Sequence, residues 1–427
     1  MQVLVIGSGA REHAIVRALS LDPTVDAVVA APGNPGIEAV ALCEPLPGGV
    51  TDAGAVVGLA QRHGVDLVVI GPEAPLVAGV ADAVRAAGIP CFGPSAEAAR
   101  LEGSKAFAKE VMSLAQVPTG MAHVCTTTAE VADAVDALGA PYVVKDDGLA
   151  AGKGVVVTED RDEALAHAAA CLAKPEGRVV VEEYLDGPEV SLFCLCDGES
   201  VVPLSPAQDF KRVGDADTGP NTGGMGAYSP LDWAPEGLVD DVVARIAQPV
   251  VDEMRHRGTP FVGVLYVGLA LTSRGPRVIE FNARFGDPET QVVLARLRTP
   301  LGGLLLAAAT GGLAGVAGLR WSQDHAVTVV VAADGYPASP RTGDPVTGLE
   351  AASTDGAYVL HAGTARDADG QLVSSGGRVL SVVATGPTLA RARERAYAAV
   401  EAVGLPGSHH RTDIALRAER GEVTLPA

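Results

Sequence analysis

Polar side chains alternate with apolar ones between residues 278 and 284, in a pattern that suits a metal site. The run Val-Ile-Glu-Phe-Asn-Ala-Arg is typical of a strand, and successive side chains of a strand point to opposite faces. Glu280, Asn282 and Arg284 therefore share one face. A carboxylate and an amide oxygen are hard ligands for a magnesium ion that bridges phosphates, and an arginine can hold a carboxylate by two hydrogen bonds. This pattern indicates a metal site, with a salt-bridged polar face as the alternative.

The segment Gly148–Gly154 joins two expected strands, Tyr142–Lys145 and Val155–Thr158. Its glycines and alanines allow the backbone to fold closely over a polyphosphate, and Lys153 adds a mobile positive charge. No Ser or Thr follows the lysine, and a strand follows instead of a helix, so the segment is not a Walker A loop. The pattern favours a phosphate-binding loop, with an ordinary hairpin turn as the alternative.

Two further lysines and an acidic hairpin can extend a nucleotide site. Lys105 begins an expected helix and Lys145 ends the strand before the glycine loop. A bent triphosphate needs several cations, which these two can supply together with Lys153, although each alone would be an ordinary surface charge. The backbone of residues 182–185 could pair with an adenine edge while Glu189 accepts from ribose hydroxyls. An acidic hairpin without a ligand is the alternative.

A glycine turn, Gly7-Ser8-Gly9, follows the first expected strand and precedes a helix. Backbone N–H groups at such a turn can bind an anion. The third glycine of a dinucleotide-binding pattern would fall at Glu12, which lowers the case for NAD. Arg11, His13 and a second loop that contains Asn34 favour phosphate binding. A tight turn without a ligand is the alternative.

The elements between these motifs predict a multidomain α/β and α+β protein. Alternating strands and helices over 1–101 indicate a parallel α/β domain. Residues 102–320 form a second domain, with a small α+β lid at about 120–187, and 321–427 form a C-terminal α+β domain. We expect a long polar loop over 209–229. Asp287 is expected to cap a helix that begins at Pro288.

Charge and composition exclude several classes of partner. The formal net charge of −20 argues against nucleic acid, which is bound through clustered Lys and Arg. The uncharged segment 301–319 contains six glycines, so a buried helix with a Gly-rich loop is expected in place of a membrane span. The six scattered cysteines lack CxxC spacing, and we expect no secretory leader, so a cytoplasmic protein is predicted. We further expect small-molecule partners and a monomer or weak oligomer.

Together these motifs resemble the glycinamide ribonucleotide synthetase family of the ATP-grasp superfamily, over nearly the whole chain. The matching segments are GSGAREHA, GPEAPL, LEGSKAF, GLAAGKGV, DTGPNTGGMGAYSP, EFNARFGDPETQ, HAGT and GGRVL. The resemblance implies that glycine attacks the γ-phosphate of ATP to give glycyl phosphate, which then acylates 5-phosphoribosylamine in purine biosynthesis. It also implies an N-terminal substrate-binding domain, an ATP-grasp domain and a C-terminal domain.

The resemblance implies residue roles as well. Arg284 and Lys153 would be catalytic, and Glu280 and Asn282 would hold Mg²⁺ or Mn²⁺. ATP would contact Lys105, Lys145, Gly148, Ala151, Gly152, Lys153, Gly154, Glu182, Glu183, Tyr184, Leu185 and Glu189. The other substrates would contact Gly7, Gly9, Arg11, Glu12, His13, Asn34, Glu73, Asp209, Lys211, Arg212, Asn221, Gly224 and Arg284.

Three positions depart from the family pattern: Ala10 in place of glycine, Asp146 in place of a small residue, and Gly268 where many relatives carry a second acid. Ala10 requires a negative φ, and Asp146 should point away from Lys145 on a regular strand. Three other functions remain as alternatives: another ATP-grasp ligase or carboxylase of purine synthesis, an NAD-dependent oxidoreductase, and a nucleotide sensor without activity.

Overall fold

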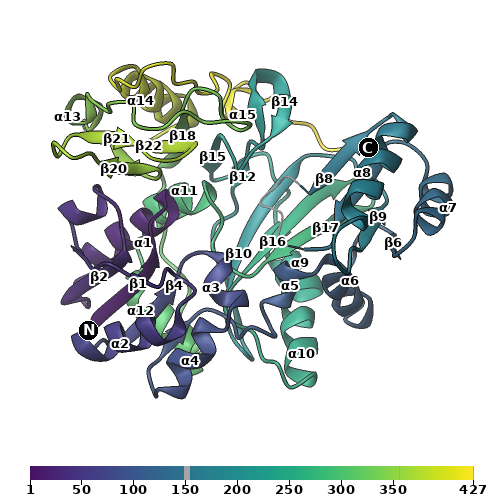
Figure 1. Cartoon of the computed structure of the whole chain (residues 1–427), viewed down its shortest axis with the longest axis horizontal. Coiled ribbons are helices and arrows are strands. Elements are labelled where there is room, and N and C mark those ends of the chain that lie inside the picture. Colours follow the sequence, from purple (N-terminus) through teal and green to yellow (C-terminus); the bar gives the residue numbers. More distant parts are fainter. Residues whose placement is uncertain (149–153, 355, 427) are drawn as a thin grey trace.

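A computed structural model describes residues 1–148, 154–354 and 356–426 (Figure 1). The N-terminal part is a parallel sheet of order β3-β2-β1-β4-β5. Its strands are β1 (Gln2–Gly7), β2 (Ala27–Pro32), β3 (Leu42–Cys43), β4 (Leu67–Ile70) and β5 (Cys91–Phe92). The strand residues Val3 to Ile6 are fully buried, as expected for a parallel sheet covered on both faces.

Helices cover both faces of this sheet. α2 (Ala53–His63) and α4 (Val80–Ala86) pack on the face that carries Leu4 and Ile6. α1 (Ala10–Ser20) and α12 (Leu301–Thr310) pack on the other face. The apolar segment at 301–319 therefore begins as a buried helix, as predicted. Among the described residues, no helix is long and apolar enough to cross a bilayer.

A four-stranded antiparallel sheet of order β11-β10-β16-β17 forms the centre of the molecule. Its strands are β10 (Glu189–Asp197), β11 (Val201–Pro203), β16 (Val262–Thr272) and β17 (Gly275–Asn282). A helical stretch at 238–256 precedes β16 and consists of the consecutive segments α9 (Leu238–Val242), η3 (Val243–Ala247) and α10 (Gln248–His256). This sheet carries the predicted metal ligands on β17.

The lid has its own sheet and its own core. Its strands are β6 (Ala122–Cys125), β7 (Tyr142–Asp146), β8 (Val155–Thr158) and β9 (Val179–Glu182), in the order β6-β9-β7-β8. α7 (Thr128–Leu138) and α8 (Arg161–Leu172) pack on it through a separate apolar cluster. Figure 1 shows these elements at the end of the molecule away from the N-terminal sheet.

The C-terminal sheet includes strands from the middle of the chain. Its order is β12-β15-β18-β22-β19, formed by β12 (Gln208–Asp209), β15 (Gly226–Ser229), β18 (His325–Ala332), β19 (Ala357–His361) and β22 (Arg378–Gly386). The expected polar loop at 209–229 is therefore largely strand, with a hairpin of β13 (Arg212–Gly214) and β14 (Thr218–Asn221) between β12 and β15. Strands this short and rich in glycine give no clear period-2 pattern.

The other elements are short or connect these sheets. They are η1 (Ile37–Ala39), α3 (Glu73–Val77), α5 (Arg100–Gly103), α6 (Lys105–Leu114), η2 (Asp215–Asp217), α11 (Glu289–Arg296), η4 (Leu313–Gly315), α13 (Leu349–Ala352), β20 (Thr364–Arg366), β21 (Leu372–Ser374), α14 (Leu389–Glu401) and α15 (Leu416–Glu419). The expected cap at Asp287 is wrong by one residue, because Pro288 is the N-cap and α11 begins at Glu289. Ala10 begins α1, so its backbone is helical and alanine fits there.

Candidate active site

Glu182, at the end of β9, is a buried carboxylate between two lysines. Its Oε1 lies 3.1 Å from Lys145 Nζ and its Oε2 lies 2.9 Å from Lys109 Nζ. Burial alone would raise the pKa of Glu182, but the two cations outweigh it and lower that pKa. Lys145 Nζ also donates to the carbonyl of Ile279 at 3.2 Å. The lid and β17 therefore meet at Lys145.

Lys109 was missed by the sequence analysis. It follows Lys105 by four residues on α6, a spacing that places two side chains on one face of a helix. Lys105 Nζ donates to the carbonyl of Gly148 at 3.0 Å. Asp147 caps the start of α6, since its Oδ1 accepts from Ser104 Oγ at 3.0 Å and from the N–H of Ala106 at 3.1 Å. The start of α6 is thus bound to the first residues of the glycine loop.

Three predicted ATP contacts, Ala151, Gly152 and Lys153, lie outside the described residues. Gly154, after them, accepts from the N–H of Asp146 at 2.7 Å. The Asp146 carboxylate pairs with Lys174 on the far side from Glu182, so this departure from the family pattern points away from Lys145 as predicted.

The acidic segment after β9 joins the lid sheet to the central sheet, so the expectation of a hairpin is wrong, because β9 and β10 belong to different sheets. Some of its groups already have partners within the protein. The N–H of Glu183 donates to Met121 O at 2.8 Å, and its carboxylate pairs with Arg274. Glu183 therefore has few groups left for an adenine. Tyr184 is exposed, and no backbone hydrogen bond of Leu185 is found among the described residues. Leu185 is the better candidate of this segment for an adenine edge.

Glu280 and Asn282 are half-buried on β17, opposite Gly268 and Tyr266 of β16. Among the described residues, neither side chain makes a hydrogen bond or an ion pair, so their oxygens are available to a ligand. The glycine at 268 leaves room beside Glu280, because a Cβ there would lie 3.3 Å from Glu280 Cγ. This donor set fits a divalent metal that takes its remaining ligands from phosphates and water.

Within the described ranges, no group of three or more His, Cys, Asp or Glu is placed to hold a metal. The protein ligands proposed here are the carboxylate of Glu280 and the amide oxygen of Asn282. Such a site is typical of Mg²⁺ bound together with a nucleotide.

Arg284 is held by two carboxylates. Its Nη2 lies 3.0 Å from Glu102 and its Nε lies 3.4 Å from Glu73. Burial would lower the pKa of Arg284, but Glu102 and Glu73 outweigh it and raise that pKa. Glu102 is almost fully buried and also accepts from the N–H of Ala283 at 2.8 Å. The guanidinium expected to bind a substrate therefore already has a firm partner in Glu102 and a longer, more accessible one in Glu73.

The N-terminal turn differs from the predicted free anion site. Glu12 Oε2 accepts from the N–H of Gly9 at 2.6 Å, so the chain's own carboxylate occupies the start of α1. Arg11 Nε donates to Glu12 Oε1 at 2.5 Å, and its Nη1 donates to Phe285 O at 3.1 Å. Gly7 is required because its φ is +132° and a Cβ there would lie 2.5 Å from Glu12 Cγ.

His13 and Asn34 also have structural roles that the sequence analysis did not anticipate. Burial, with further contributions from His361 and Arg17, lowers the pKa of His13 to about 3, so His13 adds no positive charge near neutral pH. Its Nδ1 accepts from the N–H of His361 at 2.9 Å. Asn34 Nδ2 donates to Ser8 O at 2.8 Å and to His361 O at 3.0 Å. Its Oδ1 accepts from two backbone N–H groups, so the side-chain amide of Asn34 is fully engaged within the protein.

In the predicted substrate loop, Lys211 contacts both Asp209 of the loop and Glu189 of β10. Lys211 pairs with Glu189 and lies 3.4 Å from Asp209 Oδ1. Burial raises the pKa of Asp209 to about 7, with Lys211 opposing and Glu289 and Glu189 adding to the shift. The loop and the proposed ribose contact are therefore joined through one lysine.

Arg212 and Asn221 stay within the hairpin, where they face each other on β13 and β14. Arg212 Nη1 donates to the carbonyl of Gly219 at 2.6 Å. Gly224 packs on Pro288, because its φ is +105° and a Cβ there would lie 2.4 Å from Pro288 Cδ. Gly224 thereby contacts the segment that follows β17.

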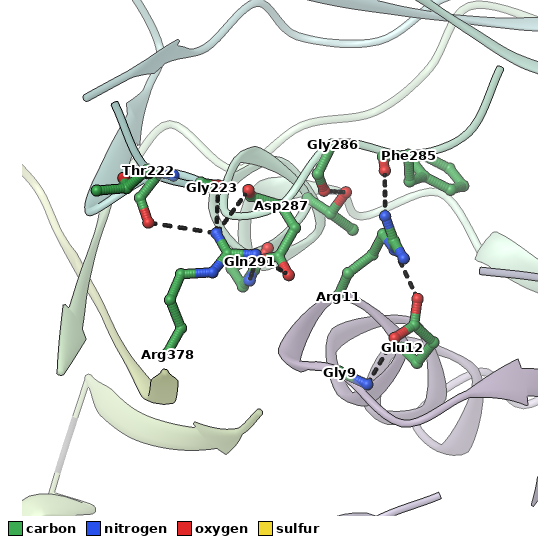
Figure 2. A network of polar contacts seen from close by, with 12 residues as sticks. Gly9, Arg11, Glu12, Thr222, Gly223, Phe285, Gly286, Asp287, Gln291 and Arg378 are labelled. Atoms are coloured by element: carbon green, nitrogen blue, oxygen red, sulfur yellow. Dashed lines mark hydrogen bonds and ion pairs between the residues drawn. The ribbon is translucent and has the colours of Figure 1, made fainter. Parts of the chain in front are cut away.

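Two arginines of the C-terminal part hold this loop. Arg411, 1% exposed in its side chain, pairs with Asp217 at 2.7 Å and donates to Arg212 O at 3.2 Å. Arg378 donates to the carbonyls of Gly223 and Gly224 and pairs with Asp287 (Figure 2). Neither arginine was assigned a role from the sequence, although Arg378 lies in the quoted GGRVL segment.

A buried triad lies beside the loop. Tyr266 OH donates to Glu289 Oε1 at 2.8 Å, and Ser191 Oγ lies 2.8 Å from the same hydroxyl and 3.1 Å from the same carboxylate oxygen. The segment EFNARFGDPETQ contains Glu289, but only its position next to Tyr266 in space shows this contact. These residues fix the start of α11 against β10 and β16.

The arrangement combines lysines of α6 and the lid, two oxygen ligands on β17 that have no partner in the described part of the chain, and a paired arginine after that strand. This set can neutralise a triphosphate, hold a divalent metal and orient a carboxylate, which are the requirements of phosphoryl transfer to a carboxylic acid.

Models of three domains of the phosphoribosylglycinamide synthetase family match the chain: the N domain over 1–102, the ATP-grasp (A) domain over 103–290 and the C domain over 326–417. A phosphoribosylamine–glycine ligase of Streptomyces coelicolor is 68% identical, over 98% of this chain and 99% of the relative. The enzyme of that name from Mycobacterium tuberculosis is 59% identical over the full length of both chains.

A crystal structure of the phosphoribosylamine–glycine ligase of Thermotoga maritima has a TM-score of 0.84 and 32% identity, and the match covers 97% of this chain and 100% of that one. A biotin carboxylase domain from Hydrogenobacter thermophilus shares the fold at 18% identity, with a TM-score of 0.71 over 96% of this chain and 91% of that one. The full-length identity and the three matched domains establish that this chain belongs to the phosphoribosylglycinamide synthetase family.

Proposed function

We propose that this protein is a phosphoribosylamine–glycine ligase of purine biosynthesis. It joins glycine to 5-phosphoribosylamine through glycyl phosphate and releases ADP and phosphate. The observation that carries this proposal is the identity of 68% over 98% of the chain to a relative of that name. The availability of Glu280 and Asn282 beside the lid lysines supports an active enzyme over a sensor without activity.

On the nucleotide side, Lys105 and Lys145 contact the phosphates together with the glycine loop that ends at Gly154. The segment 182–185 receives the adenine and Glu189 receives the ribose. Binding of the ribose competes with the contact between Glu189 Oε2 and Lys211. This exchange frees a lysine of the substrate loop for the anionic substrates.

Glu280 and Asn282 would hold Mg²⁺ or Mn²⁺, which would neutralise phosphate charge when bound. Arg284 keeps Glu102 as a fixed partner. A substrate carboxylate or acyl phosphate replaces the longer 3.4 Å contact to Glu73. Arg284 thereby orients the glycine carboxylate for attack on the γ-phosphorus.

The second step joins the two small substrates. The amine nitrogen of phosphoribosylamine attacks the carbonyl carbon of glycyl phosphate, phosphate leaves with the electrons of the broken C–O bond, and the nitrogen loses a proton. The loop at 209–224 and the N-terminal turn lie on the two sides of the segment after β17 and would enclose this acceptor. We infer a cytoplasmic protein that acts on small molecules as a monomer or weak oligomer.

The proposal is tested with the purified protein, ATP, Mg²⁺, glycine and freshly prepared phosphoribosylamine, with the product identified by mass. We expect glycinamide ribonucleotide, and sustained ADP release only when both glycine and the amine are present. Equal steady ADP release without any amine would contradict the proposal. A panel of other carboxylic acids and amines would then separate this ligase from the other ATP-grasp enzymes of purine synthesis.

A further inference from the structure

Arg378, at the start of β22, makes a dense set of contacts outside its own sheet. Its Nη1 donates to the carbonyls of Gly223, Gly224 and Asp287, the last two at 3.2 and 2.9 Å. Its Nη2 lies 2.9 Å from Asp287 Oδ2. One guanidinium from the C-terminal part therefore binds both the substrate loop and the segment that follows β17.

Asp287 lies where three parts of the chain meet. Its Oδ1 accepts from Gln291 Nε2 at 2.7 Å, so Gln291 and Arg378 each hold one carboxylate oxygen. On its other side lies the N-terminal turn, since a Cβ built on Gly9 would be 3.9 Å from Asp287 Oδ2. Figure 2 shows Arg378 and the loop approaching Asp287 from one side, while Arg11 and Glu12 of α1 lie on the other.

The loop depends on Arg378 at the point where it has few other contacts. Gly223 and Gly224 lie between the hairpin, which Arg411 holds, and β15, which pairs with β18. Within the described residues, the other bonds of these two glycines are from Gly223 N–H to Tyr336 OH at 3.0 Å and from Gly224 N–H to Thr222 Oγ1 at 3.0 Å. Both carbonyls point to Arg378, so its removal would release this turn.

We propose that Arg378 is a positioning residue for the acceptor step. It fixes the turn at 223–224 and the Asp287 carboxylate against the N-terminal turn, and so assembles the side of the active site that receives the amine. This inference rests on the proposed ligase function. Because the lysines and metal ligands lie on other elements, Arg378 acts on the acceptor and leaves nucleotide binding unchanged.

The planar guanidinium is essential to this role. Lysine keeps the positive charge but offers no fixed fork that can reach a carboxylate and two carbonyls together. Arg378→Lys should therefore recover only part of the function lost in Arg378→Ala. If the role of Arg378 were purely electrostatic, Arg378→Lys would recover almost all of the lost activity.

The test compares Arg378→Ala, Arg378→Lys and Asp287→Asn with Arg395→Ala. Arg395 is a matched control, because its Nη1 donates to a single carbonyl, that of Thr385 at 2.7 Å, within the C-terminal part. Nucleotide affinity is measured by calorimetry, and kcat and KM are measured for each substrate. Hydrogen exchange of 222–226 reports the turn directly and does not depend on the reaction.

We expect Arg378→Ala to lower kcat/KM for the amine by at least about 30-fold, as for loss of a partly buried charge pair, and to change nucleotide affinity less than about twofold. Guanidinium ions at low concentration should restore part of the activity. Exchange at 222–226 should increase. The double variant with Asp287→Asn should lose less than the product of the two single losses.

Two results would overturn the inference: kinetics and exchange of Arg378→Ala that match Arg395→Ala, or a loss of nucleotide affinity as large as the loss of turnover. If the parent protein forms no glycinamide ribonucleotide, the ligase proposal fails. The exchange measurement still decides in that case whether Arg378 holds the turn.

Discussion

Glu182 and Arg284 have corresponding surroundings of opposite charge. Glu182 is a buried anion between Lys145 and Lys109, and Arg284 is a largely buried cation between Glu102 and Glu73. The first trio carries a net positive charge and the second a net negative charge. The first trio suits phosphates, whereas the second leaves an arginine that is fixed in position and has one exchangeable partner.

Glu280→Gln tests the metal site with little change of volume. We expect nucleotide affinity to remain near that of the parent, because the lid lysines are unchanged. Turnover should fall by at least about a hundredfold, since a metal contributes several kcal/mol to the transition state and about 1.4 kcal/mol is a tenfold change in rate. Nucleotide binding and turnover over a range of magnesium concentrations are the measurements. Parent-like turnover at limiting magnesium would show that Glu280 is not a ligand.

Arg284→Lys should raise the KM for glycine and also lower kcat. A lysine can keep one carboxylate contact but cannot hold Glu102 while binding a substrate carboxylate through a planar fork. We expect kcat/KM for glycine to fall by about tenfold or more. Glu73→Gln is the control and should change glycine kinetics less. A loss of thermal stability with unchanged glycine kinetics would assign Arg284 a purely structural role.

At the level of elements, the apolar strands and helices were predictable and the substrate loop was not. The parallel sheet, the lid and the apolar helix α12 follow from runs of Val, Leu and Ala. The strands β12 and β15 were missed because they are short, and their pairing with β18 depends on residues far along the chain.

In the candidate site, too, some residues could be predicted from the sequence and others could not. Residues proposed for their own chemistry, such as Lys145 and Glu280, could be selected from type and spacing, and their roles stay predictions. The structural roles of Glu12 and Asn34 could not, because each depends on the exact position of a backbone group, and in Asn34 one of those groups belongs to His361. The partners Lys109, Glu102 and Arg378 become visible only when the elements are assembled.

Gly224→Ala tests the turn at the level of the element. A side chain there has an unfavourable φ of +105° and meets Pro288 Cδ at 2.4 Å. Gly237→Ala is the matched control, because its φ is +77° but nothing lies within 4 Å of the added Cβ. Both variants should lose about 1–2 kcal/mol in free energy of unfolding from φ alone, measured by urea unfolding.

Only Gly224→Ala should also lose most of its turnover, because the methyl group displaces the turn from the segment after β17. Equal turnover in the two variants would show that the packing of Gly224 on Pro288 does not matter for the reaction.

At the level of the whole molecule, two histidines join the first and last domains. Burial is the main cause that lowers the pKa of His13 to about 3 and that of His361 to about 4, and Arg17 and Arg366 add to it. An unfolded histidine titrates near 6.5. Between these values the unfolded state binds more protons, so the free energy of unfolding should fall as the pH is lowered from about 7 toward 4.

His13→Asn should reduce this pH dependence, because asparagine keeps an acceptor for the N–H of His361 but does not titrate. A histidine that stays neutral in the folded protein lowers the free energy of unfolding at pH 5 by about 2 kcal/mol relative to neutral pH. Urea unfolding at pH 5 and pH 7.5 measures the difference. His256→Asn, at an exposed position, is the control and should behave like the parent. An equal pH dependence in His13→Asn and the parent would contradict the assignment.

The pairing of β15 with β18 also has a consequence for synthesis on the ribosome. Ala227 pairs with Thr328, so its partner strand emerges about a hundred residues later, and ribosomes add roughly 5–20 residues per second. For about 5–20 seconds the edge of β15 remains unpaired, and in the later part of this interval, once β17 has been made, the nascent chain holds the N-terminal sheet, the lid and the strands of the proposed nucleotide site. A chain interrupted before β18 would therefore bind nucleotide without an assembled acceptor loop, and its open strand edge would be a target for chaperones and for aggregation.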